Sequence, residues 1–365
     1  MKNVLIIIGK LVVGGAERVG RDIGYYADKK KYNIYYIVFG EESGVYEKEL
    51  RAKGCKIYHF APPSENYLEF CRKLNYFIKR KHINVVHSHT MFNSGIVLSI
   101  ARWNHVPVRI AHSHSIRGPE HRGVIKTAYE NFMRKSIIRN ATKLVACGKS
   151  AGRWLYGEGV FTSKGILIHN GINLEVYGYN EEKRKRIREM YGISGSFVIG
   201  HVGHLAAVKN QAFIIKLMPE ILKRIPDTMF MIVGDGHDKE MLYELVQNMG
   251  MEDHILFTGN VNNVGDYMSA MDVFAFPSLY EGMPLSLVEA QTNGLPCIIS
   301  DHIPDDVYLT DLIKPLPLEN SQSQWIAAVT GTMRNQSEKY KSMMFSKGFD
   351  TSVMLEKIYQ LYDEI

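Results

Sequence analysis

The sequence has 365 residues, of which 45% are hydrophobic and 22% are charged. This composition is typical of a soluble globular protein, and the length predicts two domains. No apolar stretch reaches 18 residues, so we expect no membrane-spanning helix. The first apolar run is interrupted by Gly9 and Lys10, which argues against a signal peptide. The four cysteines are scattered without a CxxC pair, which indicates reduced thiols in a cytoplasmic protein.

The net charge of +6 conceals two halves of opposite sign. Residues 1–175 contain 28 Lys and Arg against 13 Asp and Glu, a net +15, whereas residues 176–365 contain 16 against 25, a net −9. A basic half of this kind indicates an anionic partner, either nucleic acid or an anionic membrane surface. The aromatic residues show no pattern of stacking platforms and the second half is acidic, so we expect no nucleic-acid partner.

Short apolar, β-branched runs alternate along the chain with stretches of helical length. This pattern predicts α/β units whose parallel sheets are covered on both faces. The rhythm restarts near residues 175–195, which predicts two such sheets, and residues 349–365 have the spacing of an amphipathic final helix. The expected strands are 4–8, 35–39, 56–60, 85–87, 108–111, 144–146, 166–168, 197–202, 229–233, 255–258, 273–276 and 297–300.

Glycine-bearing turns follow several of these strands, where open parallel sheets bind their ligands. Glycines let a ligand approach the backbone, and the helix that follows favours an anion at its N-terminus. Each turn is equally compatible with a tight connection that binds nothing. The turns contain Gly14 and Gly15, Gly203 with Lys209 downstream, and Gly234.

Two His-x-His pairs end neighbouring strands: His87 with His89, and His112 with His114. Residues i and i+2 of a strand point to one face, so either pair could contribute to a metal site. Zinc sites need three or four ligands, and neither pair has an accompanying carboxylate pattern. We therefore interpret the pairs as polar lining of a ligand cleft and expect no metal site.

The stretch EGMPLSLVE carries Glu281 and Glu289 around a predicted helix start. Pro284 suits the first helical position, and Gly294 suits the end. The N–H groups of the first turn favour a diphosphate, so the two carboxylates would have to face sugar hydroxyls. Taken alone, the stretch fits equally a helix with one acid near its start and one on its solvated face. The other glycine turns favour the ligand site.

Together these motifs resemble the retaining glycosyltransferases of family 4, a GT-B group that includes capsule and exopolysaccharide enzymes. Residues 272–301 are similar to the family's E-x7-E region, and the resemblance covers essentially the whole chain, including HNGIN at residues 169–173. It implies an α/β fold of two Rossmann-like, doubly wound parallel-sheet domains facing a central cleft. Residues 1–175 would bind the acceptor, residues 176–350 the nucleotide-sugar, and the helix at 351–365 would pack back toward the first domain.

The resemblance also implies roles for individual residues. Glu289 would bind the ribose, Glu281 the donor sugar, and Lys209 the diphosphate. His114, or in second place His112, would contact the donor sugar. The other donor-binding positions would be Gly14, Gly15, Gly203, His204, Gly234, Gly282, Met283, Pro284 and Leu285.

One position departs from the family pattern. The family usually has Arg where this chain has His204. A histidine is mostly neutral near pH 7 and lacks the planar fork of an arginine. Diphosphate binding is then expected to be weaker, unless the ligand protonates His204.

The reaction implied by the resemblance moves a hexose from a UDP-sugar to a lipid-linked saccharide acceptor, with retention of configuration, in surface polysaccharide synthesis. It requires no cofactor, no essential metal and no protein nucleophile. A basic helix beginning at Arg122, with apolar residues at helical spacing, predicts contact with the inner face of an anionic membrane. The alternative is an ordinary helix packed on the sheet. The apolar residues are Ile125, Tyr129, Phe132, Met133 and Ile137.

Three other functions remain open from the sequence. A glycosidase would use Glu281 and Glu289 as its acid and base, but it leaves Lys209 and the glycine turns without a role. A sugar-nucleotide epimerase would share the two-sheet architecture. A non-catalytic GT-B partner subunit would account for His204.

Overall fold

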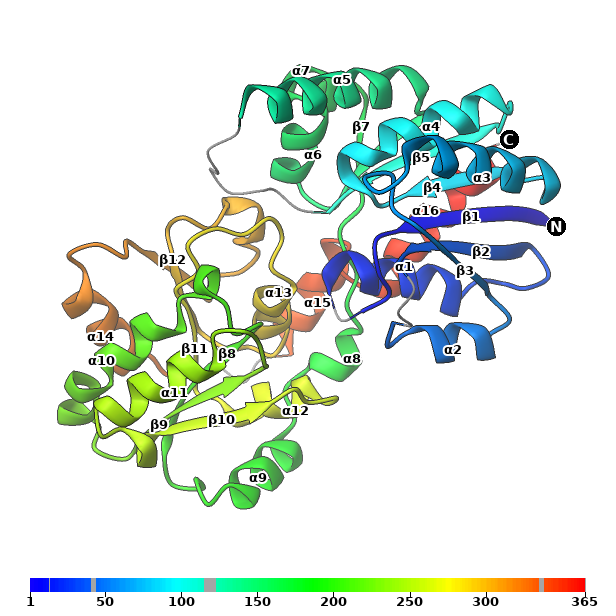
Figure 1. Ribbon diagram of the computed structural model, residues 1–365. Helices are drawn as coiled ribbons and strands as arrows, with labels where there is room; N and C mark the ends of the chain where they lie inside the picture. Colours follow the sequence, from blue (N-terminus) through cyan, green and yellow to red (C-terminus); the bar gives the residue numbers. More distant parts are fainter. Residues whose placement is uncertain (13, 41–43, 115–122, 335–337, 365) are drawn as a thin grey trace. The chain divides into compact units, whose positions relative to one another are not determined.

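A computed structural model describes residues 1–12, 14–40, 44–114, 123–334 and 338–364. The chain forms two compact units, one of Met1–Gly171 with Thr351–Ile365 and one of Ile172–Asp350. The boundary predicted from the sequence lies slightly later, between residues 175 and 176. Within each unit, helices cover both faces of a parallel sheet (Figure 1).

The first unit contains a seven-stranded parallel sheet. Its strand order reverses between β1 and β4, which is the point where doubly wound sheets bind ligands. The central strand β1 is apolar and buried along most of its length, as expected of a strand covered on both faces. In spatial order the strands are β3 (Lys56–Phe60), β2 (Tyr32–Phe39), β1 (Lys2–Ile8), β4 (Val85–Ser88), β5 (Val108–Ser113), β6 (Lys143–Ala146) and β7 (Gly165–Leu167).

Alternate residues of this sheet enter two separate cores. Ile6 faces a core shared with α1, α2 and α16, whereas Ile7 faces a core shared with the helices α3 to α7. The period of two along a strand explains this division. The helices are α1 (Gly15–Tyr25), α2 (Glu47–Ala52), α3 (Tyr67–Arg80), α4 (Ser94–Trp103), α5 (Val124–Asn140), α6 (Lys149–Tyr156), α7 (Glu158–Lys164) and α16 (Thr351–Asp363), with a 3₁₀ turn at Met91–Asn93.

The final helix α16 completes the first unit although it is the last element of the chain (Figure 1). Its buried stripe of Met354, Leu355, Ile358, Leu361 and Tyr362 has helical spacing and joins the core over α1. Tyr359 donates a hydrogen bond of 2.8 Å to the carbonyl of Ile23.

The second unit contains a six-stranded parallel sheet with the same reversal of order, here between β8 and β11. The helices α10, α11 and α14 share a core with one face. The helices α12 and α13 pack against strands of the same sheet, and α8, α9 and α15 pack against these two helices. The strands are β10 (Ile255–Gly259), β9 (Thr228–Val233), β8 (Phe197–Val202), β11 (Val273–Phe276), β12 (Cys297–Ser300) and β13 (Ile313–Leu316). The helices are α8 (Leu174–Tyr177), α9 (Glu181–Met190), α10 (Gln211–Arg224), α11 (Lys239–Asn248), α12 (Val264–Ala270), α13 (Leu285–Thr292), α14 (Gln322–Thr330) and α15 (Lys339–Ser346), with 3₁₀ turns at Ala207–Lys209, Glu252–His254 and Asp305–Val307.

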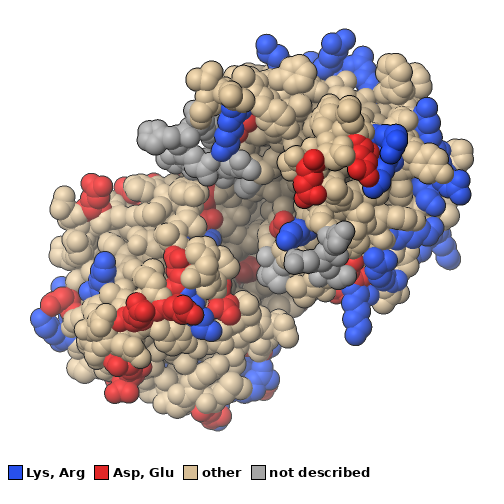
Figure 2. Space-filling model, in the orientation of Figure 1, with Lys and Arg blue, Asp and Glu red and all other residues tan. Residues whose placement is uncertain are grey.

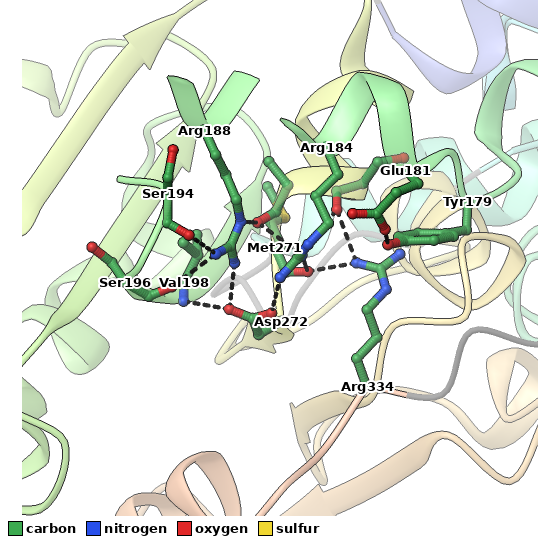
Figure 3. A network of polar contacts seen from close by, with 12 residues as sticks. Tyr179, Glu181, Arg184, Arg188, Ser194, Ser196, Val198, Met271, Asp272 and Arg334 are labelled. Atoms are coloured by element: carbon green, nitrogen blue, oxygen red, sulfur yellow. Dashed lines mark hydrogen bonds and ion pairs between the residues drawn. The ribbon is translucent and has the colours of Figure 1, made fainter. Parts of the chain in front are cut away.

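A carboxylate, Asp272, organises the amino-terminal end of this sheet (Figure 3). It bonds to Arg184 at 2.6 Å, to Arg188 at 2.5 Å and to the N–H of Val198 at 2.8 Å. Arg184, Arg188 and Arg334 also donate to backbone carbonyls at the end of α12. Cations at a helix C-terminus are stabilising, so this network is structural.

The twelve strands predicted from sequence are all present, but the structure adds β13. Two further predictions need correction. Pro284 precedes α13 as its N-cap and is not its first residue. The helix α5 does not form a single apolar stripe, because Met133 and Ile137 are buried while Ile125, Tyr129 and Phe132 are exposed. Arg122 lies outside the described residues.

The four cysteines are not joined in disulfide bonds, and three of them, Cys55, Cys147 and Cys297, are buried. In the part of the chain that the structure describes, no helix combines the length and the apolar character needed to cross a membrane.

Candidate functional site

The loops after β8 and β11 meet at the carboxyl end of the second sheet. The backbone of Leu279 donates to the carbonyl of Val208 at 2.8 Å, which ties the two loops together. Lys209 in the first loop and Glu281 in the second form an ion pair with 2.5 Å between Nζ and Oε1. Both side chains are largely buried, with 17% and 15% of their surfaces exposed. The Lys209 ammonium also lies 5.3 Å from the centre of the Phe276 ring, a cation–π contact.

Glu281 and the buried Glu289 lie on either side of the start of α13. Glu281 precedes the helix in the loop, while Glu289 is in its second turn and is 6% exposed. Between them, Gly282, Met283 and Pro284 lead into Leu285, the first residue of the helix. The first N–H groups of a helix have no acceptor within the helix and carry a partial positive charge. The site therefore combines a lysine, a helix N-terminus and two carboxylates.

The glycine turns after β8 and β9 pack against each other. Gly234 has φ +138°, and a Cβ on it would lie 2.1 Å from the carbonyl oxygen of Gly203. Only glycine permits this approach, because any side chain would clash with backbone. The packing of the two turns therefore explains why residue 234 is glycine, and no ligand is needed for this explanation. The same packing holds Gly203 beside Lys209.

A buried histidine, His201, supports the loop that carries Lys209. Its Nδ1 bonds to the carbonyl of Ala275 at 3.0 Å, so its Nε2 accepts from Gln211, at 3.3 Å. The same Gln211 amide donates to the carbonyl of His204 at 3.0 Å. Burial lowers the pKa of His201 to about 4, so the ring is neutral. His204 itself is exposed, and its ring centre is 5.6 Å from that of His237.

The Gly14-Gly15 turn of the first unit begins α1, as predicted. A Cβ on Gly14 would lie 2.3 Å from Oε2 of Glu17, so this carboxyl group lies directly against the turn. Burial raises the pKa of Glu17. An anionic ligand at the start of α1 would therefore meet the Glu17 carboxyl group.

The two His-x-His pairs merge into one cluster, which we call the histidine quartet: His87, His89, His112 and His114. The centres of neighbouring rings lie 4.0–5.3 Å apart. His87 contacts His112 at 3.2 Å, and His89 contacts His114 at 2.7 Å. The pairs meet because β4 and β5 are adjacent parallel strands.

Two residues from distant segments hold the quartet at its ends. Asn170 of the HNGIN motif contacts Nδ1 of His114 at 3.2 Å, and the hydroxyl of Tyr362 on α16 contacts Nδ1 of His87 at 2.7 Å. Burial lowers the pKa of His87 to about 3 and that of His114 to about 4, so both rings are neutral. Burial likewise lowers the pKa values of His89 and His112.

A groove of about 680 Å³ lies between α4 and α5 in the first unit. Trp103 and Phe132 on its walls are 78% and 67% exposed. Figure 2 shows lysine and arginine spread over this unit, on the face in view. An exposed surface that combines aromatic and basic side chains suits an anionic interface. The groove is lined by Ser99, Arg102, Trp103, His105, Phe132, Lys135, Ser136, Arg139 and Asn140.

Comparisons with known proteins agree with this geometry. The family model described as Glycosyltransferase Family 4 matches residues 13–176, and that described as Glycosyl transferases group 1 matches residues 183–343. EpsF of Bacillus subtilis (strain 168), named as a glycosyltransferase, is 31% identical over 99% of this chain and 96% of its own length. The chain belongs to glycosyltransferase family 4.

Two further relatives of this family 4 chain have more specific names. The capsular polysaccharide biosynthesis glycosyltransferase CapH of Staphylococcus aureus is 25% identical over 99% of both chains. A UDP-Gal:alpha-D-GlcNAc-diphosphoundecaprenol alpha-1,3-galactosyltransferase of Escherichia coli is 30% identical over 61% of this chain and 59% of its own. Among solved structures, Anabaena Alr3699/HepE in complex with UDP superimposes with a TM-score of 0.81 over all of both chains, at 19% identity.

These findings confirm the predicted glycosyltransferase family and the GT-B fold of two Rossmann-like units. The roles assigned to individual site residues stay predictions. The structure brings together Lys209, Glu281 and the start of α13 in one unit, and His112 and His114 in the other. The contacts of Asn170 and Tyr362 with the quartet are not predicted from the sequence. Asn170 lies within a quoted motif, but nothing near Tyr362 in the sequence marks it.

Proposed function

We propose that this family 4 glycosyltransferase moves a sugar from a UDP-sugar to a lipid-linked saccharide acceptor, with retention of anomeric configuration, in surface polysaccharide synthesis. The observation that carries the proposal is the Lys209–Glu281 ion pair beside the start of α13, at the switch point of the second sheet. The UDP in the HepE structure, and the donor and acceptor in the name of the Escherichia coli relative, support this choice of substrates.

The leaving group of the proposed reaction is the UDP diphosphate. Lys209 and the first N–H groups of α13 would stabilise its developing charge, and Glu289 would accept hydrogen bonds from the ribose. Glu281 holds the Lys209 ammonium in place before the donor binds. The carboxylate would then accept hydrogen bonds from the donor sugar, since it would repel the diphosphate at contact distance.

We further propose that the transfer needs no cofactor, no protein nucleophile and no divalent ion at the diphosphate, because a lysine and a helix N-terminus supply the positive charge there. His114 would contact the donor sugar. The Asn170 contact fixes the orientation of this ring. Retention is tested by following the anomeric configuration of the newly formed linkage by NMR. Turnover that is unchanged on adding Mg²⁺ or Mn²⁺ would agree with the proposed role of Lys209.

The acceptor side of the proposal rests on the first unit. The groove between α4 and α5 combines exposed Trp103 and Phe132 with Arg102, Lys135 and Arg139. Basic side chains attract anionic lipid head groups, and aromatic side chains partition into the interface. We therefore propose that the protein binds peripherally at the inner face of the membrane, where a lipid-linked acceptor would be presented.

The first test is calorimetric titration of the protein with UDP, GDP and ADP, repeated on Glu289→Gln. We expect UDP to bind and the variant to bind it at least about tenfold more weakly, the loss of one to two hydrogen bonds with a charged group. If none of the nucleotides bound, the proposal would be wrong and a non-catalytic partner subunit would become the better interpretation. If UDP-sugars were interconverted without an acceptor, the protein would be an epimerase.

A further inference from the structure

The histidine quartet contains nitrogen atoms that no protein group satisfies. Nε2 of His89 and Nε2 of His112 are buried, and neither has a hydrogen-bond partner among the described residues. A buried polar atom without a partner is unfavourable, because it has given up its hydrogen bonds to water. Two such atoms within one cluster of four neutral rings call for an explanation beyond packing.

The hydrogen bonds around His89 determine whether its unpartnered Nε2 carries a proton or a lone pair. The oxygen Oδ1 of Asn170 can only accept, so His114 donates from its Nδ1. The neutral His114 ring then has a lone pair at Nε2, which accepts from Nδ1 of His89. With its proton on Nδ1, His89 presents a bare lone pair at the buried Nε2. An imidazole with this arrangement is a metal ligand with its outer hydrogen bond already in place.

We propose that His87, His89 and His112 form a binding site for a transition-metal ion of the Zn²⁺ class. One ring nitrogen of each lies within 4.8 Å of the others. His87 Nε2 and His112 Nδ1 are 3.2 Å apart and share a hydrogen bond. To bind the ion, the ring that carries this proton would move it to its other nitrogen, and the two lone pairs would then lie near the separation of about 3.4 Å that two nitrogen ligands have on tetrahedral zinc. A purely imidazole donor set suits zinc, copper or nickel and not Mg²⁺ or Ca²⁺, which take oxygen ligands.

The surroundings of the three rings favour metal binding over protonation. A metal needs neutral imidazole, and all three rings are buried, which disfavours the charged form. His87 contacts the hydroxyl of Tyr362 through Nδ1, so its Nε2 points toward the other rings of the quartet. The outer partners of the site are thus Tyr362 for His87 and His114 for His89.

The ion would act on the architecture of the first unit. It would join the carboxyl ends of β4 and β5 and, through His87 and Tyr362, would couple them to α16. It would also fix His89, which holds His114. The site adjoins His114, which has a donor contact in the proposed function, but its test does not depend on the transfer reaction, since it measures metal affinity and not turnover.

The test uses the full chain purified without a polyhistidine tag. Elemental analysis gives the metal content after gel filtration, and a Co²⁺ titration of metal-free protein gives the visible absorption bands of a tetrahedral site. We expect saturation at one equivalent in the wild type, and a rise in the thermal midpoint with Zn²⁺. His89→Gln should lose the spectrum and this rise, whereas His82→Asn, which removes an exposed histidine of the same unit, should keep both.

Two features of the variants keep the test decisive. His89→Gln removes no hydrogen bond at Nε2, because that atom has no partner. The Gln amide can still donate to Nε2 of His114 in place of Nδ1 of His89, so the metal-free variant should fold as the wild type does. Tyr362→Phe leaves all three ligands in place but removes an outer partner, which should weaken Zn²⁺ binding about 10–100-fold. The proposal is overturned if the wild type shows no saturable Co²⁺ spectrum, or if His89→Gln and His82→Asn bind Co²⁺ and Zn²⁺ equally well.

Discussion

Oε1 of Glu281 lies 2.5 Å from Nζ of Lys209, across 72 residues of sequence. The pair joins the loop after β8 to the loop before α13, so the lysine is already held at the start of that helix. A diphosphate arriving there would compete with Glu281 for the ammonium. The two residues should therefore affect nucleotide binding in opposite directions.

We predict that Glu281→Gln binds UDP as tightly as the wild type or more tightly, while its kcat for sugar transfer falls. The amide of Gln is uncharged, so the Lys209 ammonium loses its carboxylate partner and can bind phosphate instead. The amide oxygen is also a weaker hydrogen-bond acceptor for the donor sugar than the carboxylate is. Lys209→Met should instead weaken UDP binding and lower kcat by about 10²-fold or more. Calorimetry with UDP and steady-state kinetics separate the two effects. If both variants lost UDP affinity equally, the ion pair would be only a structural contact.

His204→Arg should strengthen UDP binding about tenfold. The guanidinium would add a charge-assisted hydrogen bond, which contributes roughly 1.5–3 kcal/mol, and part of this is offset by ordering an exposed side chain. His237→Arg is the matched control. His237 is exposed, and its ring centre lies 5.6 Å from that of His204. An equal gain in both variants would indicate a general effect of charge and would argue against a specific position for the arginine.

Most strands could be predicted from the sequence because each is a short, almost continuous apolar run. The exception, β13, contains Lys314 and Pro315, which argue against a central strand. Proline is tolerated because β13 is at the edge of the sheet and need not donate on its outer side. On α5, the helical spacing of the apolar residues did not show which of them are buried, nor that the polar residue Asn140 is buried as well. The buried Asn140 is accommodated because its amide donates to Ser99 on α4 at 2.9 Å.

The sequence predicts the separate motifs of the candidate site, but it does not predict which motifs lie next to one another in the structure. Each His-x-His pair alone offers two ligands, and only the pairing of β4 with β5 shows that the pairs form one cluster. Likewise, the sequence motifs give no reason to place Lys209 against Glu281. Contacts across such separations depend on strand order and register, which local patterns do not encode.

The free energy of unfolding should fall as the pH decreases from about 6.5 to about 4, in part because of His201. Its pKa is about 4 in the folded protein and 6.5 as a model value, so the unfolded chain binds the additional proton in this interval. The stabilisation is complete above pH 6.5 and is lost on acidification, at up to about 1.4 kcal/mol per pH unit. His201→Gln keeps a donor and an acceptor and should show a shallower slope in urea unfolding. Parallel slopes would exclude a contribution from His201.

Asp272→Asn should destabilise the second unit by about 3–5 kcal/mol, because it leaves the buried Arg188 without its carboxylate (Figure 3). Glu189→Gln on the same helix removes an exposed partner of Lys185 and should cost less than about 0.5 kcal/mol. Urea unfolding measures both. Asp272 precedes β11, at the end of the sheet away from Lys209, so UDP affinity should be unchanged in folded Asp272→Asn. A loss of affinity would connect the network to the site.

The groove between α4 and α5 should determine binding to anionic membranes. Lys135→Glu should weaken flotation with phosphatidylglycerol vesicles by at least about fivefold, since each basic residue near the surface contributes about 1 kcal/mol. Phe132→Ser should weaken it without changing charge, because it removes an exposed apolar side chain.

Lys30→Glu makes the same charge change on an exposed residue of the same unit outside the groove and is the control. If Lys30→Glu and Lys135→Glu were equally impaired, net charge and not the groove would drive binding. If the wild type bound neither phosphatidylglycerol nor phosphatidylcholine vesicles, α5 would be an ordinary helix packed on the sheet.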